Sequence, residues 1–253
     1  MIKYMIAIGF FVSMVISCNQ KMERDANDII NKSIEVSGGE LIKKSTINFD
    51  FRDIHYRAMR ENGKFVLERS FTDKSYQYFD TITQITDAIT NKGFQRFVNA
   101  FPVAVLDSMA AKYTASINSV HYFSVLPYGL NGEAVNKTYL EAVTLKGNIY
   151  HKIKITFNEE GGGEDFEDEF VYWVNVETFK TDYIAYSYNE PDGLGLRFRE
   201  AYNERYVYGI RFVDYNNFKP KENTVLLEKL DELFEQGELQ LLSKIELENI
   251  SVN

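Results

Sequence analysis

The chain is poor in cysteine, proline and tryptophan, with one, four and one of each among its 253 residues. A single cysteine cannot form an intramolecular disulfide, so side-chain packing alone must stabilise the fold. Basic residues are also in the minority, because 28 Lys and Arg stand against 37 Asp and Glu, for a formal net charge of −9. This acidic balance, without any Lys/Arg cluster, argues against a nucleic-acid partner bound through its phosphates.

Motifs for catalysis and for metal binding are missing from the sequence. There is no G-x-S-x-G segment, and the only cysteine, Cys18, lies in the N-terminal leader. The histidines His55, His121 and His151 are too scattered to form a zinc motif. Acidic residues flank the glycines at 161–163 without EF-hand spacing, which favours a solvated hairpin over a calcium loop. We therefore assign no catalytic residue, no metal and no cofactor.

The N-terminus has the parts of a secretory signal peptide. Lys3 supplies a positive charge, and a short apolar run at 6–16 precedes the small residue Ser17. A run this short is typical of a signal peptide and not of a membrane span. We expect residues 1–17 to be removed on export.

Cys18 ends the segment Val15-Ile16-Ser17-Cys18, which resembles a bacterial lipobox. That resemblance implies lipidation of the Cys18 thiol, and several acyl chains make membrane attachment effectively permanent. Residues 18–24 are polar and are predicted to form a tether. We therefore predict a protein anchored by lipid in the cell envelope, at the outer membrane, and the sequence leaves open which face of that membrane it occupies.

The rest of the chain, residues 25–253, is predicted to form a single domain, since 45% hydrophobic and 15% aromatic content is ample for a core. Helical periodicity is confined to 25–37, a segment from Pro102 to about residue 121, and 226–234. The strands between them show no alternating βα rhythm, which excludes a Rossmann or TIM-type sheet. We predict a mostly β (α+β) fold, a curved antiparallel sheet or incomplete β-barrel of about 10–11 strands with about three helices packed on it as a lid.

Three consecutive strands in the middle of the chain are predicted to organise the sheet. They span residues 149–158, 166–176 and 181–188. In the first strand the odd positions are apolar and should face the core, while the even positions should face water. Antiparallel pairing then places Ile153 opposite Phe170.

Two carboxylates are predicted to lie among the apolar side chains of the strands. Asp168 falls on the inward face of the second of the three strands, and Glu200 occupies a similar position on a later strand. Buried charges need partners. Each carboxylate is therefore either half of a structural ion pair with Arg197, Arg199 or Arg211, or part of a polar headgroup site at the mouth of a cavity.

Aromatic side chains are concentrated on the same strands, where they either fill the core or line a cavity. The helix that begins at Pro102 likewise either packs on the sheet or covers that cavity as a lid. The residues predicted to bind a ligand are His151, Asp168, Tyr172, Trp173, Tyr186, Phe198, Glu200 and Tyr208.

Parts of the chain resemble known families. The segments similar to the C-terminal half of LolA-like envelope proteins are residues 173–180, 183–188, 198–202 and 209–212, with Asn175 in place of the usual aspartate. Short matches that include Tyr172-Trp173 and Arg197-Phe198-Arg199-Glu200 resemble a family of uncharacterised Bacteroidota lipoproteins. The resemblance implies the LolA-like fold, an incomplete antiparallel barrel with an apolar interior able to hold acyl chains. It brings no activity and no catalytic residue.

These observations predict a lipid-anchored envelope protein that binds an apolar or amphiphilic ligand, such as a lipid or the acyl chains of a lipoprotein, in a half-barrel cavity. Its partners would be the membrane and a hydrophobic molecule, and its oligomeric state is left open. One alternative is a ligand-free envelope scaffold or protein-interaction module. The other is a hydrolase, which requires Asp168, Glu200 or His151 to lie within hydrogen-bond reach of each other at an open cleft.

Overall fold

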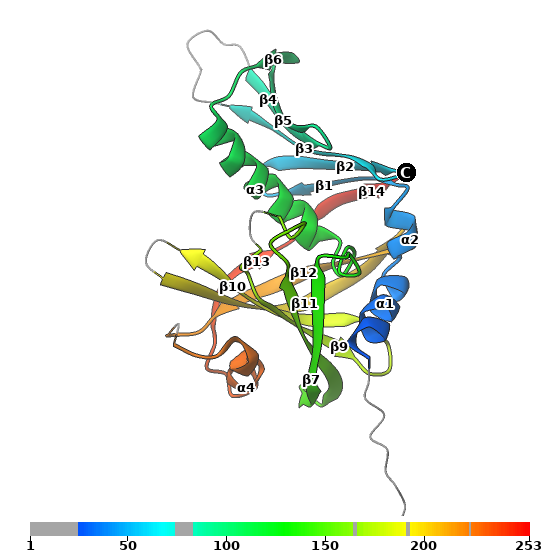
Figure 1. Ribbon diagram of the computed structural model, residues 1–253, viewed down its shortest axis with the longest axis vertical. Coiled ribbons are helices and arrows are strands. Elements are labelled where there is room, and N and C mark those ends of the chain that lie inside the picture. The colour runs from blue at the N-terminus through cyan, green and yellow to red at the C-terminus, as the bar shows by residue number, and fades with distance from the viewer. Residues whose placement is uncertain (1–24, 74–82, 164–165, 191–192, 223) are drawn as a thin grey trace, which may run out of the picture.

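The computed structural model describes residues 25–73, 83–163, 166–190, 193–222 and 224–253. These residues form two seven-stranded antiparallel sheets, one above the other in Figure 1. The first sheet has the strand order β14-β1-β2-β3-β4-β5-β6, and the second has the order β13-β12-β11-β10-β9-β8-β7. Each sheet is thus a meander, and the chain returns to the first sheet at its end, where β14 pairs with β1.

The elements have the following bounds. The first sheet contains β1 (Thr46–Phe51), β2 (Ile54–Glu61), β3 (Lys64–Asp73), β4 (Thr83–Thr90), β5 (Gly93–Val98), β6 (Phe101–Val103) and β14 (Glu248–Val252). The second contains β7 (Val135–Leu145), β8 (Asn148–Phe157), β9 (Phe170–Asn175), β10 (Thr181–Glu190), β11 (Gly193–Val207), β12 (Ile210–Lys219) and β13 (Gln240–Ile245). The helices are α1 (Ala26–Val36), α2 (Gly39–Ile42), α3 (Asp107–Ser124), the 3-10 turn η1 (Leu227–Lys229) and α4 (Leu230–Glu235).

The predicted fold class, mostly β with antiparallel strands and packed helices, is confirmed. The described residues hold 14 strands, which exceeds the predicted number, and they divide between two sheets that do not close on themselves. One added strand arises at Arg52, whose φ of 55° marks the turn between β1 and β2, and another is β14. The strand predicted from Ser75 to Phe79 lies outside the described residues.

The long helix begins later than predicted. Pro102 lies in β6, and α3 starts at Asp107. β6 is the edge strand of the first sheet and pairs with β5. An edge strand tolerates proline because one side of its backbone has no ladder to complete. The sequence pattern alone placed the proline in the first turn of a helix, where it is equally acceptable.

α1 confirms the first predicted helix. The carboxylate of Asp25 caps it by accepting a hydrogen bond of 2.8 Å from the N–H of Asn27, and the three isoleucines of one helix face are buried. After the helix, Gly38 adopts a φ of 82°, and a Cβ at this position would clash with the carbonyl oxygen of Gly209. Glycine is therefore required where the end of α1 meets the β11–β12 turn.

The second sheet is buried on both faces. One face packs against α1 and the segment after α3, and its core residues include Ile30, Leu126, Ile153, Tyr172, Ile184 and Tyr215. The opposite face is covered by η1 and α4, and its core residues include Tyr150, Val171, Trp173, Tyr183, Phe198 and Phe234. The prediction that the even positions of β8 face water is therefore wrong. Lys152 is only 1% exposed, because α4 covers that side of the sheet.

The register of β8 with β9 differs from the predicted one by a shift along the strands. Phe170 lies opposite Ile155, and Ile153 lies opposite Tyr172. Odd positions still face even ones, so the predicted division into faces holds for this pair. Because the connection after β8 is longer than a tight glycine turn, β9 begins only at Phe170. Asp168 consequently precedes the strand, and its predicted place in the middle of the inward face is wrong.

α3 connects the two sheets. On the first sheet, the Tyr113 ring lies 4.0 Å from the guanidinium of Arg96, and Arg69 donates a hydrogen bond of 2.9 Å to Ser116. Both arginines also bind the carboxylate of Asp87, which is fully buried. The C-terminal end of the helix then reaches across to the second sheet (Figure 1).

Candidate functional site

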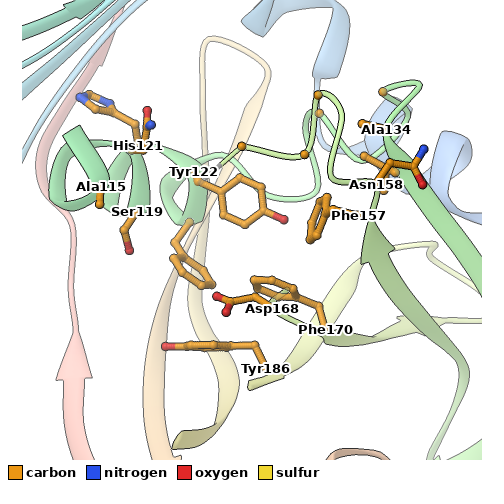
Figure 2. Close-up of a pocket in the computed structure, with 18 of the residues that line it drawn as sticks. Ala115, Ser119, His121, Tyr122, Ala134, Phe157, Asn158, Asp168, Phe170 and Tyr186 are labelled. Carbon is orange, nitrogen blue, oxygen red and sulfur yellow. The ribbon is translucent and has the colours of Figure 1, made fainter. Parts of the chain in front are cut away.

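A cavity of about 1500 Å³ lies where the end of α3 meets the second sheet. It is bordered by α3, by segment 125–135, by the loop after β8, and by parts of β9 and β10. Ligand pockets usually measure about 300–1,000 Å³, so this space is large enough for a small molecule or a lipid chain. Figure 2 shows Tyr122, Phe157, Phe170 and Tyr186 gathered around one common space, with His121 turned away from it.

One side of the cavity is an aromatic wall, made of Tyr122, Phe123, Phe157, Phe170 and Tyr186. The rings touch in sequence. Phe157 meets Phe170 edge-on at 5.8 Å between ring centres, Phe170 stacks on Tyr186 at 5.5 Å, and Tyr186 meets Phe123 at 5.1 Å. Such pairs stabilise one another through their quadrupoles, so the wall keeps its shape.

Local structure explains why these five rings meet. Tyr122 and Phe123 are consecutive residues in the last turn of α3. Phe170 and Tyr186 lie directly opposite each other in the β9–β10 pair, and side chains at such paired positions share one face of the sheet. The wall therefore combines a helix end with two paired strands, and Phe157 at the end of β8 completes it.

Behind the aromatic wall lies a row of hydroxyl groups. The Tyr122 and Tyr172 hydroxyl oxygens are 3.1 Å apart, and Tyr172 is fully buried. Burial raises the pKa of both phenols above the usual tyrosine value. Both groups therefore stay neutral at physiological pH and keep a proton to donate.

Arg199 places a positive charge in the same region. Its side chain stands on β11, is 8% exposed, and lies 3.7 Å from the centre of the Phe123 ring. Its Nη2 donates a hydrogen bond of 2.7 Å to the Tyr186 hydroxyl. Its Nε and Nη1 atoms are buried and have no hydrogen-bond partner among the described residues. Since Phe123 and Tyr186 both line the cavity, this charge lies directly behind the aromatic wall.

The border also includes five charged residues, here called the charged rim: Arg60, Glu133, Glu160, Glu167 and Asp168. Glu133, Glu160 and Glu167 are exposed, whereas Asp168 is half-buried. Charges in water are screened within about 8 Å at physiological salt. The exposed rim charges therefore act more weakly on a bound molecule than a buried charge does.

His121 lies beside the rim and is held neutral. It is 1% exposed, and its Nε2 lies 3.0 Å from the carbonyl oxygen of Glu68. Burial lowers the pKa of His121 to about 4, and the nearby Arg60 charge acts in the same direction, while the Glu68 contact opposes them. The imidazole also packs edge-on against Phe49 and Tyr56, which ties the end of α3 to the first sheet.

Of the eight residues predicted to bind a ligand, the structure places Asp168 and Tyr186 on the cavity lining. Tyr172 lies behind the wall, bonded to Tyr122. His151 is on the same face of the second sheet but packs against Tyr139 and Phe179.

The other four predicted residues lie away from the cavity. Trp173 and Phe198 are in the core beneath α4 on the opposite face of the sheet. Glu200 accepts a hydrogen bond of 3.0 Å from Asn216, and Tyr208, in the turn between β11 and β12, is 76% exposed. Asp168, Glu200 and His151 thus occupy separate places, and these three do not form the acid–base group that the alternative hydrolase requires.

Sequence reasoning did not select several residues that define the cavity. Tyr122 and Phe123 belong to an apolar stretch that directly follows the predicted helix, and this position at a helix end was the available signal. Arg199 was treated as a candidate partner for a carboxylate. Its alternation with Phe198 on one strand indicated the opposite faces of the two side chains, but nothing in the sequence showed that it faces aromatic rings.

Two further properties concern the described part of the chain. No helix in it is long and apolar enough to cross a membrane. Nor do three or more His, Cys, Asp or Glu side chains gather there in a group that could hold a metal ion.

The fold and the site define the class of protein: two antiparallel sheets with an aromatic cavity beside the long helix. The chain belongs to a family described as "Family of unknown function (DUF6503)", whose model matches residues 5–247. No curated protein matches its sequence.

Solved structures of similar arrangement include proteins from several bacteria. A LolA superfamily protein from Nitrosomonas europaea shares 10% identity with a TM-score of 0.45, covering 90% of this chain and 93% of that one. A DUF1329 family protein from Desulfovibrio piger shares 10% identity with a TM-score of 0.46, covering 89% and 91%. A putative outer membrane lipoprotein-sorting protein domain from Vibrio parahaemolyticus shares 9% identity with a TM-score of 0.43, covering 90% and 91%.

Proposed function

We propose that this protein binds an apolar or amphiphilic molecule, such as a lipid or the acyl chains of a lipoprotein, in the cavity beside α3. The observation that carries the proposal is the cavity of about 1500 Å³ with five aromatic rings along one side. Moving an acyl chain from water onto such rings gains about 0.8 kcal/mol for each methylene that is buried. The wall therefore supplies the driving force for binding an apolar chain, and the charged rim, with the half-buried Asp168, borders the same cavity.

The same observation argues against a ligand-free scaffold. In a scaffold whose aromatic residues only pack together, the rings would fill the space between α3 and the second sheet. Here they border an open volume larger than the usual ligand pocket. The rings are in contact with one another along the wall, so the open volume does not come from loose packing within it.

The proposal includes a place for the protein in the cell. Cys18 follows a signal-like apolar segment and the lipobox-like residues Val15 to Ser17. We infer attachment of the mature chain to the outer membrane through lipid on Cys18, with residues 18–24 as the tether and 25–253 as the binding domain. Attachment would bring the cavity close to a source of acyl chains.

Dye binding tests the proposed function. The full-length chain carrying Cys18→Ser is titrated with the neutral dye N-phenyl-1-naphthylamine, and bound dye is then displaced with 1-dodecanol below its solubility limit. We expect a saturable rise in dye fluorescence that dodecanol reverses. Absence of saturable binding for both compounds would overturn the proposal.

A matched pair of tryptophan variants locates the binding. Ser119 lies on the cavity side of α3, whereas Ser108 is an exposed residue of the same helix outside the cavity lining. Ser119→Trp places an indole in the cavity and should weaken dye binding by roughly tenfold or more, the effect of losing about 1.4 kcal/mol of contact. Ser108→Trp should leave it unchanged. Equal effects of the two substitutions would show that the dye binds elsewhere.

A separate experiment addresses the anchor. Wild type and Cys18→Ser are expressed in a bacterial host with a lipoprotein-processing pathway, and membrane and soluble fractions are compared. We expect the wild type in the membrane fraction and the variant in the soluble one. A variant that stays with the membrane would contradict lipid attachment at Cys18. This result would not bear on ligand binding in the cavity.

A further inference from the structure

We propose that Arg199 is the binding site for the anionic group of the ligand, so that the molecule held in the cavity is an amphiphile with a carboxylate or a phosphate. This inference rests on the proposed function and narrows its ligand class. It is carried by a contrast among the buried arginines of the described chain, which are Arg69, Arg199 and Arg211.

The other two buried arginines are neutralised by carboxylates. Arg211 donates from Nε to Glu204 at 2.6 Å and from Nη2 to Asp182 at 3.1 Å, and its Nη1 binds the carbonyl oxygen of Thr181. Arg69 donates from two nitrogen atoms to Asp87 at 3.0 and 2.9 Å. These arginines follow the rule that a buried charge is paired.

Arg199 departs from that rule. Among the described residues its side chain makes one hydrogen bond, to the neutral hydroxyl of Tyr186, and its Nε and Nη1 have no partner there. Stacking on Phe123 at 3.7 Å and on Tyr186 at 5.0 Å stabilises the cation in part but supplies no acceptor for those N–H groups. An uncompensated buried charge lowers the stability of the fold, and such a cost is retained at functional sites.

The geometry matches an anion that enters from the cavity. A guanidinium offers its N–H groups as a planar fork, which fits the two oxygens of a carboxylate or a phosphate. Tyr122 and Tyr172 add neutral hydroxyls in the same region. Burial raises the pKa of Tyr172, and the nearby Arg199 charge acts in the opposite direction. The Phe123 ring lines the cavity and packs on the face of the guanidinium, so an entering anion has to move this ring to reach the N–H groups at the guanidinium edge.

The rim carboxylates do not oppose this assignment. Glu133, Glu160 and Glu167 are exposed, so water and salt screen their repulsion. Asp168 is half-buried on the lining and already has an interaction of its own. An anion at Arg199 lies behind the aromatic wall, where the attraction of the buried cation is stronger than that of an exposed one.

Displacement of N-phenyl-1-naphthylamine from the full-length Cys18→Ser chain tests the inference. The competitors share one chain length and differ in charge: dodecanoate, dodecyl phosphate, 1-dodecanol and dodecylamine, all below their critical micelle concentrations. We expect the two anions to displace the dye at concentrations roughly tenfold to a hundredfold lower than dodecanol, the effect of one charge-assisted hydrogen bond. The order of dodecanoate and dodecyl phosphate identifies a fatty acid or a phospholipid as the source of the anion.

Three variants complete the test. Arg199→Met should abolish the preference for anions over dodecanol, Arg199→Lys should restore part of that preference, and Arg57→Met is an exposed control that should leave both affinities unchanged. Arg199→Met should also unfold at the same or higher urea concentration than its parent, since it removes an unpaired charge. Phe123→Ala, which uncovers the guanidinium, should retain the preference.

The outcomes separate this inference from the proposed function. Binding of dodecanol and dodecanoate with equal affinity, or an anion preference that survives in Arg199→Met, overturns the role of Arg199 while a hydrophobic cavity still stands. Failure of the dye and every competitor to bind overturns the proposed function, and the anion site falls with it. A strongly destabilised Arg199→Met, together with an Arg199→Lys variant that folds but binds dodecanol and dodecanoate with equal affinity, would assign Arg199 a structural role.

Discussion

Lys152 and Asp231 form a buried ion pair that joins the second sheet to α4. The Lys152 ammonium lies 3.0 and 2.9 Å from the two carboxylate oxygens, and the indole Nε1 of Trp173 donates to the same carboxylate at 3.1 Å. Lys152 and Asp231 are 1% and 4% exposed. A polar position of β8 is thus buried because a helix far along the chain brings it a counter-charge.

Asp231→Asn should destabilise the protein by about 3 kcal/mol, because it leaves the Lys152 charge buried without its main partner. Glu141, 3.7 Å from Lys152, limits the loss only in part because it is largely exposed. Urea unfolding followed by Trp173 fluorescence measures the effect, and the emission of the folded state should shift as well. The exposed neighbour Glu232, paired with Lys229, is the control, and Glu232→Gln should leave the unfolding curve nearly unchanged. Similar curves for both variants would contradict the structural role of the pair.

Asp87→Asn should lower the free energy of unfolding at least as much as Asp231→Asn, by about 3–5 kcal/mol, because the one buried carboxylate of Asp87 binds both Arg69 and Arg96. The comparison variant is Glu68→Gln on the neighbouring strand, whose 3.8 Å contact with the half-exposed Arg57 should contribute about 1 kcal/mol or less. Chemical denaturation of both variants gives the two free energies of unfolding. A loss of similar size at both positions would refute the assigned role of Asp87.

Stability should fall as the pH is lowered from about 6.5 to about 4 because of His121. Its folded-state pKa is about 4, against 6.5 for an ordinary histidine, so in this range the unfolded chain binds a proton that the folded protein does not. The stabilising contribution is complete above pH 6.5. It is lost by about pH 4, and this loss amounts to about 3 kcal/mol. His121→Gln lacks the titrating group, and the difference between the two unfolding free energies should follow this curve. Parallel pH profiles would exclude it.

Gly38→Ala should destabilise the protein by more than Gly63→Ala. Both glycines have positive φ values, 82° and 77°, so each substitution carries the same backbone strain of about 1–2 kcal/mol. At Gly38 the new Cβ also meets the carbonyl of Gly209, whereas at Gly63 no atom lies within 4 Å. Thermal unfolding of the two variants isolates the clash, and equal melting temperatures would argue against close contact between α1 and the β11–β12 turn.

Local chemistry made much of the fold predictable from sequence. The Asp25 cap and the glycines after α1 define that helix, and the turn at Asn62-Gly63 defines the β2–β3 hairpin. Such signals act within a few residues, so they survive without knowledge of the rest of the structure. Alternation on β8 likewise gave the correct parity of its pairing with β9.

What sequence could not supply depends on distant partners. Whether Lys152 faces water is decided by Asp231, and whether Pro102 opens a helix or ends an edge strand is decided by β5. The site follows the same division. Tyr186 was predicted from strand patterning, and Asp168 lines the cavity from the loop before β9 although that pattern placed it in the strand. The unpaired state of Arg199, in contrast, depends on which carboxylates the tertiary fold leaves out of its reach.

α3 is fixed at two places along its length, and this has a thermodynamic consequence. Its middle is held to the first sheet through Tyr113 and Ser116, and its last turn supplies Tyr122 and Phe123 to the cavity. A ligand that binds the docked helix more tightly than a displaced one must stabilise the contacts around Asp87 by the same free energy, because linkage is reciprocal. Binding of a ligand in the cavity and the stability of the contacts between α3 and the first sheet are therefore thermodynamically coupled.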